Sequence, residues 1–172
     1  MNKNILITAI AAFCLILPIR TSFLYAQAAS GPRVEIAITD NLVLKQGETR
    51  TAQRDSTGAL LTHPGDVIQY TLTAVNRGTQ PAHEAEMIDP VPKGTEYVPG
   101  SAFGEGMTIT YSIDGGKFYQ PQPITYDFRK SDGAVEKRPA LPGMYTHIKW
   151  LVNKPILPGT RVSASFRVKV ID

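Results

Sequence analysis

Apolar and polar side chains alternate along several stretches of this chain. The clearest stretch is residues 161–170, where every second position is apolar, and the same pattern occurs in residues 34–39, 68–74, 107–113 and 147–152. Because successive side chains of a strand point to opposite faces, each stretch predicts a strand with one buried and one solvent-exposed face. No stretch after residue 28 has the period of about 3.6 residues that marks an amphipathic helix. The pattern therefore predicts an all-β domain.

Turn residues separate these stretches. Asp114-Gly115-Gly116 lies between two apolar-patterned arms and predicts a hairpin. Asn76-Arg77-Gly78 is expected to end the strand that begins near Ile68, since Asn and Gly accept the left-handed backbone of a turn. Residues 89–94 contain two prolines, which cannot donate hydrogen bonds to a sheet, and predict a rigid loop. Short strands at this spacing favour a Greek-key β-sandwich of about 7–9 strands over an up-and-down barrel.

Two segments lack this regular alternation. Residues 45–66 are polar and rich in turn residues, and we expect a short hairpin or an exposed excursion there. Residues 120–143 hold several prolines and glycines, and we expect mostly loop around one strand near residues 124–128.

Residues 1–28 have the features of a cleavable signal peptide. Lys3 supplies a positive start, residues 5–17 are almost entirely apolar, and Ala26-Gln27-Ala28 supplies the small residues of a cleavage site. The apolar run is shorter than the roughly 20 residues of a membrane-spanning helix, so we expect no integral membrane segment after cleavage. These features predict export to the periplasm, the cell surface or the extracellular space.

Removal of residues 1–28 would also change the composition. Cys14 is the single cysteine, so the exported chain would carry no disulfide, which suits a bacterial envelope or surface. The formal net charge is +3, and two of the cations, Lys3 and Arg20, lie in this segment. A nearly neutral domain has no overall field for nucleic acid, which we exclude as a partner. We expect an N-terminal strand and polar excursion in residues 29–63, followed by one domain in residues 64–172.

A set of turn and core residues recurs in a recognisable order between residues 64 and 171. Its members are Gly65, Asp66, Tyr70, Asn76, Gly78, Asp89, Pro90, Pro92, Gly94, Trp150, Pro158 and Gly159. In this order they resemble the bacterial and archaeal surface-repeat family called domain of unknown function eleven. The resemblance implies an immunoglobulin-like β-sandwich of extracellular and envelope proteins, often present as tandem copies in adhesins and cell-wall proteins. It implies no enzymatic activity, and it gives these residues structural roles.

The residue types of catalytic and metal sites are sparse. His63, His83 and His147 have no short spacing between them, so no zinc site is expected. The chain has no Gly-x-Ser-x-Gly motif, and its serines fall on the solvent-exposed faces of predicted strands. We therefore expect no enzyme, no catalytic residues and no cofactor.

The acidic residues do not form a calcium site either, because no loop offers about six converging oxygens. Asp114 is expected to shape its Gly-rich turn, and Glu84, Glu86 and Asp89 are expected on a solvated face. Trp150 is expected in the core, and Tyr145 is expected to form a hydrogen bond at a strand corner.

One surface feature could bind a ligand. If the last two predicted strands pair, their outer faces form a basic strip of His147, Lys149, Arg161, Arg167 and Lys169. Such a strip suits an anionic polysaccharide, a lipid headgroup or an acidic partner. The same side chains also keep a sheet face soluble and block edge pairing, and we favour this second interpretation.

The sequence thus predicts a non-catalytic, exported binding or scaffold module of the envelope or surface, acting through protein or glycan contacts. The alternative is a structural subunit of an extracellular fibre, in which a strand from residues 29 to about 53 completes the next copy's sheet edge. Pairing of that strand within its own domain would argue against the alternative.

Overall fold

The computed structural model describes residues 30–43 and 51–171, and these residues form strands, turns and one short 3-10 turn, η1 (Pro142–Met144). The strands are β1 (Val34–Val43), β2 (Val67–Asn76), β3 (Glu86–Pro90), β4 (Thr95–Tyr97), β5 (Phe103–Gly104), β6 (Met107–Ser112), β7 (Thr125–Arg129), β8 (Val135–Pro139), β9 (His147–Val152) and β10 (Arg161–Val170). Across the described ranges no helix is both long and apolar enough to cross a membrane. The predicted signal peptide lies outside these ranges.

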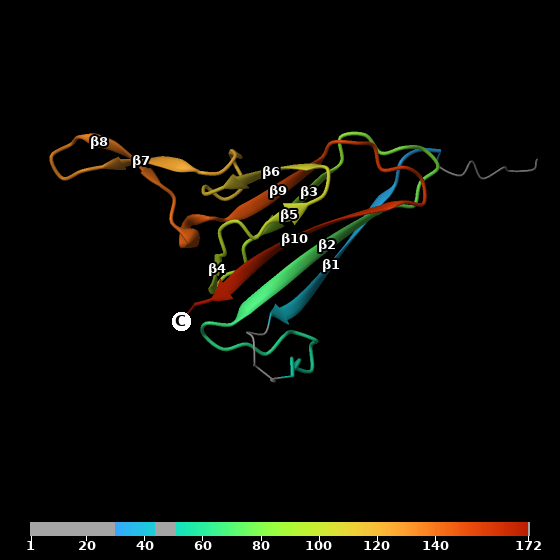
Figure 1. Ribbon diagram of the computed structural model, residues 1–172, viewed down its shortest axis with the longest axis horizontal. Helices are drawn as coiled ribbons and strands as arrows, with labels where there is room; N and C mark the ends of the chain where they lie inside the picture. Colours follow the sequence, from blue (N-terminus) through green and yellow to red (C-terminus); the bar gives the residue numbers. More distant parts are fainter. Residues whose placement is uncertain (1–29, 44–50, 172) are drawn as a thin grey trace, which may run out of the picture.

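Two antiparallel sheets face each other (Figure 1). The five-stranded sheet has the order β1-β2-β10-β4, with β5 also pairing with β10, and the three-stranded sheet has the order β3-β9-β6. Strand β10 therefore lies between β2 and β4, although it is the last strand of the chain. This order excludes an up-and-down barrel and confirms the predicted all-β sandwich.

The core fills the space between the sheets. Its largest fully buried side chains include Trp150 on β9, Phe166 on β10 and Leu72 on β2. The Phe166 ring packs on both the Tyr70 ring and the Trp150 ring, with centroids 5.4 and 5.8 Å apart. The alternation predicted for residues 68–74, 147–152 and 161–170 is thus confirmed, including the core position of Trp150.

Strand β1 pairs with β2 along its whole length of 10 residues, but the prediction that Ile36 and Ile38 lie on a buried face is wrong. Ile36 and Ile38 lie opposite the core residues Ala74 and Leu72 and share their face, yet they are 49% and 52% exposed. In Figure 1, β1 lies on the side of the larger sheet away from β6 and β9. The smaller sheet does not reach over β1, so these isoleucines remain in contact with solvent.

The turn at residues 76–78 forms, but not for the predicted reason. Neither Asn76 nor Gly78 has a positive φ. The buried Asn76 side chain accepts hydrogen bonds from the Arg33 and Gly78 amides and donates to the Gln80 and Ile156 carbonyls. A Cβ on Gly78 would clash with the backbone of residues 31–33. Glycine is required there because two chain segments touch.

Two expected loops contain strand residues. Asp89 and Pro90 belong to β3, so the proline-rich loop begins only at Val91, and Pro90 is tolerated because it ends an edge strand. Residues 120–143 form a hairpin of β7 and β8 that projects from the sandwich, so the second strand was missed (Figure 1).

The two remaining turn predictions hold in part. Across the turn at residues 114–116, only Tyr111 and Gln120 pair, so the predicted hairpin is reduced to one bridge. Residues 51–63 form a mainly exposed excursion with a single bridge between Arg54 and Leu60, as one of the two expectations stated. Residues 45–50 lie outside the described ranges.

Candidate functional site

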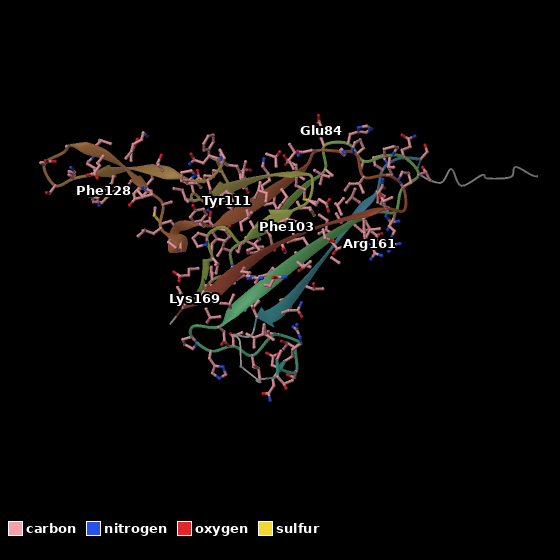
Figure 2. All side chains as sticks on the ribbon, in the orientation of Figure 1. Glu84, Phe103, Tyr111, Phe128, Arg161 and Lys169 are labelled. Atoms are coloured by element: carbon pink, nitrogen blue, oxygen red, sulfur yellow. The ribbon has the colours of Figure 1, made fainter. Side chains whose placement is uncertain are left out.

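A groove of about 530 Å³ opens between the β5–β6 turn and the start of β10. Phe103 and Arg161, both labelled in Figure 2, are among the residues that line it. The lining residues are Phe103, Glu105, Gly106, Val152, Lys154, Pro155, Arg161, Val162 and Ser163. The groove is therefore built from residues 103–106 and from two later segments, residues 152–155 and 161–163, which are close to each other in the sequence.

An exposed aromatic ring forms one wall of the groove. Strand β5 pairs with β10 through Gly104 and Phe103. A Cβ on Gly104 would meet Met107 Sδ at 2.6 Å and the Trp150 ring at 3.0 Å, so glycine lets β5 lie close to the core without displacing these side chains. The neighbouring Phe103 side chain is 65% exposed. Gly104 thus anchors β5, and Phe103 offers an apolar surface to solvent.

Two cations line the same groove. Within residues 30–43 and 51–171, neither Lys154 nor Arg161 forms an ion pair, and Glu105 is the single carboxylate among the lining residues. An arginine guanidinium binds a carboxylate with two parallel hydrogen bonds. A ring beside two unpaired cations can therefore hold a ligand that has one apolar face and one acidic group.

The predicted basic strip is not brought together. Its premise was that the last two strands pair, but β9 and β10 belong to different sheets. His147 and Lys149 lie on β9, and the other three residues, Arg161, Arg167 and Lys169, lie on β10. Figure 2 places Arg161 and Lys169 at opposite ends of β10.

Most of the strip residues already have partners. The Lys149 Nζ lies 3.2 Å from a Glu86 oxygen, and the Lys169 Nζ lies 3.7 Å from a Glu96 oxygen. The Arg167 Nε donates to the Gln69 amide oxygen at 3.0 Å. Arg161 is the strip residue that lines the groove.

Asp89 is buried, not solvated as expected. It is 8% exposed, it lies on the inner face of β3, and burial raises its pKa from 3.8 to about 6. Three buried side-chain atoms lack a hydrogen-bond partner in the part of the chain that is described: Asp89 Oδ2, His147 Nδ1 and Trp150 Nε1. The burial of Asp89 could have been predicted from the sequence, because Asp89 follows the buried Met87 by two residues and so shares its face of the strand. Glu84 and Glu86 are exposed, as expected.

The other polar candidates have structural roles. The Asp114 carboxylate accepts from the Ser112 hydroxyl and from the Lys117 and Phe118 amides, and these hydrogen bonds lower its pKa. Asp114 therefore shapes its turn, as expected. The Tyr145 hydroxyl accepts a hydrogen bond from the side-chain amide of Gln122 at 3.0 Å. Burial raises the pKa of the neighbouring Tyr111.

The remaining motif residues also hold turns. Gly65, Gly94 and Gly159 have positive φ values of 87°, 78° and 76°. The Asp66 carboxylate accepts from the His63 amide, and the Pro92 carbonyl accepts from the Thr95 hydroxyl. Gly159, which follows Pro158, donates its amide hydrogen to the Asn76 carbonyl.

The histidines do not converge. His63 and His83 are exposed, and His147 lies on β9. Among residues 30–43 and 51–171, no cluster of three or more His, Cys, Asp or Glu side chains could hold a metal ion.

Comparison with known proteins adds no relative. No family model, no curated protein and no solved structure matches this chain.

Proposed function

We propose that this chain is a non-catalytic, exported binding module of the cell envelope or surface. Its contact surface is the groove that Phe103, Lys154 and Arg161 line, and its ligand is an anionic surface glycan. The observation that carries the proposal is the exposed ring beside two cations that form no ion pair with any described residue.

The sandwich favours contact over chemistry. Large apolar side chains fill the space between its sheets, so outer faces, edges and loops are left for function. No histidine or cysteine is among the lining residues of the groove, and its titratable side chains are Glu105, Lys154 and Arg161. With two cations and one carboxylate, the groove offers groups that suit recognition of an acidic ligand.

Export is supported by the signal-like pattern of residues 1–28. The envelope or surface setting is supported by the resemblance to the surface-repeat family, and a glycan is an abundant ligand in that setting. An acidic sugar fits the groove because its ring carbons can lie on Phe103 while its carboxylate meets Arg161.

Affinity chromatography on immobilised polygalacturonate tests the proposal. We expect retention that falls with added salt, and a loss of roughly tenfold or more in affinity when Lys154→Glu and Arg161→Glu are combined. The matched control combines Lys149→Glu and Arg167→Glu, which makes the same charge change away from the groove. Equal losses in both double variants, or retention on neutral dextran, would reject the groove as the glycan site. Stronger binding to poly-glutamate than to polygalacturonate would instead identify an acidic protein as the partner.

The fibre-subunit alternative receives less support. Strand β1 occupies the edge of β2 within its own chain, and this is the arrangement stated above as an argument against strand exchange. We therefore place the binding module first.

A further inference from the structure

Strand β1 has an open hydrogen-bonding edge. Among residues 30–43 and 51–171 it pairs with β2 alone, and no described strand lies along its other side. The Asn76 amide donates to the Thr160 carbonyl and the Asn76 carbonyl accepts from the Gly159 amide, so both groups of Asn76 point to the β10 side. Because neighbouring residues of a strand direct these groups to opposite sides, the amide and carbonyl of Val75 point to β1. Because Val75 lies opposite Glu35, odd-numbered residues of β1 bond to β2. The amides and carbonyls of Val34, Ile36 and Ile38 therefore point outward.

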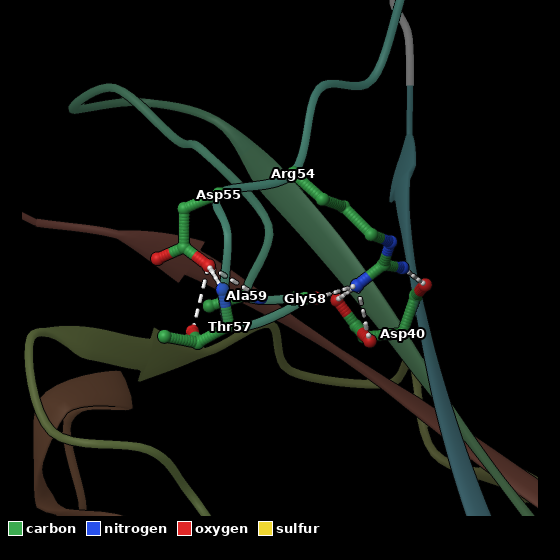
Figure 3. Close-up of polar contacts among 6 residues, drawn as sticks. All are labelled: Asp40, Arg54, Asp55, Thr57, Gly58 and Ala59. Carbon is green, nitrogen blue, oxygen red and sulfur yellow. Dashed lines mark hydrogen bonds and ion pairs between the residues drawn. The ribbon is translucent and has the colours of Figure 1, made fainter.

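This open edge has defined ends. On one side Pro32 has no amide hydrogen to donate. On the other side Arg54 covers the strand, as Figure 3 shows. Its Nη2 donates to the Asp40 carbonyl at 2.8 Å, and its Nη1 lies 3.2 Å from both carboxylate oxygens. The open segment is thus residues 33–39, and its middle residue is Ile36.

The open segment lacks several of the usual protections against pairing, and its two charged side chains, Arg33 and Glu35, pair with each other. Natural edge strands are blunted by lysine, proline or a bulge. Strand β1 contains no lysine or proline, and its register with β2 runs without a bulge from Val34 to Val43. Its Ile36 and Ile38 side chains are half exposed on the face that elsewhere packs in the core. A regular, apolar and uncovered strand edge is a template for another strand.

We propose that the occupant is a second copy of this chain, paired antiparallel along β1 about a two-fold axis at Ile36. In this register Ile36 lies opposite Ile36 of the second copy, and Val34 lies opposite Ile38. These pairs exchange about six main-chain hydrogen bonds. The register ends where Asp40, already bonded to Arg54, meets Pro32 of the second copy, which has no hydrogen to donate.

The side chains are complementary in this register. On the inner face, the exposed isoleucines cover each other and Val34. On the outer face, Glu35 lies opposite Ala37 and Arg33 lies opposite Thr39, so no like charges are directly opposed. Within each copy, Glu35 is already paired with Arg33 at 2.9 Å and with Arg77 at 3.5 Å. The two Glu35 side chains that lie diagonally across the axis are therefore neutralised.

This pairing closes on itself. Both copies use the same edge, so the contact is isologous and stops at a dimer. It joins the two larger sheets into one continuous sheet, and it needs neither the groove nor a ligand. The dimer is thus independent of the proposed glycan binding.

Analytical ultracentrifugation of the purified chain over a concentration series tests the dimer. We expect a concentration-dependent monomer–dimer equilibrium, and a monomer at every concentration after Ile36→Lys. Ile88→Lys is the matched control, because Ile88 is 47% exposed on another edge strand, β3. A monomer at all concentrations in the unaltered chain overturns the proposal, and so does a dimer that Ile88→Lys disrupts as strongly as Ile36→Lys.

Disulfide trapping in a Cys14→Ser background tests the register. Glu35 and Ala37 form a non-hydrogen-bonded pair across the proposed axis, with Cα atoms about 4.5 Å apart, within the range of a disulfide. A mixture of Glu35→Cys and Ala37→Cys chains should therefore form a mixed disulfide dimer on mild oxidation. Either variant alone should not, because identical positions lie roughly 8 Å apart. Efficient homodimers of Ala37→Cys alone would move the axis and overturn the proposed register.

Discussion

The buried Asp89 carboxyl allows a test of how burial of a charge changes the stability of the fold with pH. The Asp89→Asn substitution keeps the shape of the side chain and removes the negative charge at neutral pH. Burial raises the pKa of Asp89 from 3.8 to about 6, so the folded chain holds its proton more tightly than the unfolded chain does. Stability is then greatest below about pH 4, where the carboxyl is protonated in both states. It falls as pH rises toward about 6, where the folded state also ionises.

The size of this effect follows from the shift. A shift of about two pH units corresponds to at most about 3 kcal/mol of unfolding free energy. Asp89 lies on an edge strand, where nearby water screens the charge, so we expect about 1–2 kcal/mol. The asparagine variant should lack this loss and should be more stable than the unaltered chain by that amount at pH 8.

Urea denaturation of both proteins between pH 4 and 8 measures the difference. Asp127→Asn, on the exposed hairpin, is the control for losing any aspartate. Curves for the unaltered chain and for Asp89→Asn that stay parallel across this range would refute the reasoning. A loss of stability in Asp89→Asn at pH 8 would refute it as well, since the charged form would then be the better accommodated one.

Two further substitutions test the turn at residues 76–78, which follows β2 and touches the backbone of residues 31–33. Gly78→Ala should cost about 2–4 kcal/mol, because its Cβ would meet the backbone of residues 31–33, while Gly143→Ala, which has nothing within 4 Å, should cost under about 1 kcal/mol. Asn76→Ala should cost about 2–4 kcal/mol, because it leaves the buried Ile156 carbonyl without that donor. Asn153→Ala, at an exposed position, should cost about 0.5 kcal/mol. Urea denaturation measures all four, and equal costs within either pair would contradict the assigned contacts.

The strands could be predicted where alternation of apolar and polar residues alone determines which side chains are buried. Alternation in β2 and β10 identifies the buried set, because both strands lie inside a sheet that is covered by the other. The same rule failed for Ile36 and Ile38, since alternation shows which side chains share a face but not whether another layer covers that face. Coverage depends on how far the smaller sheet extends.

The candidate site was harder to predict for a related reason. The basic strip assumed that consecutive strands pair, whereas β9 and β10 lie in opposite sheets. The groove joins Phe103, Lys154 and Arg161, which no short motif connects. Strand order is a property of the whole chain, so residues brought together by it leave no local pattern. Asp89 differs, because its spacing from Met87 placed it on the buried face.

The hairpin of β7 and β8 behaves as a small unit of its own. Among the described residues the two strands pair only with each other. At the base of the hairpin the Ile124 side chain packs in the core, and the Ile124 carbonyl accepts from the Ala140 amide of the other arm. Its paired strands carry surface contacts, such as Arg138 lying 3.7 Å over the Phe128 ring and the Lys137–Asp127 ion pair at 2.7 Å. Two strands without a hydrophobic layer are marginal in water, so this arm can open while the rest stays folded. Its backbone amides should then exchange with deuterium long before those of β2 and β10.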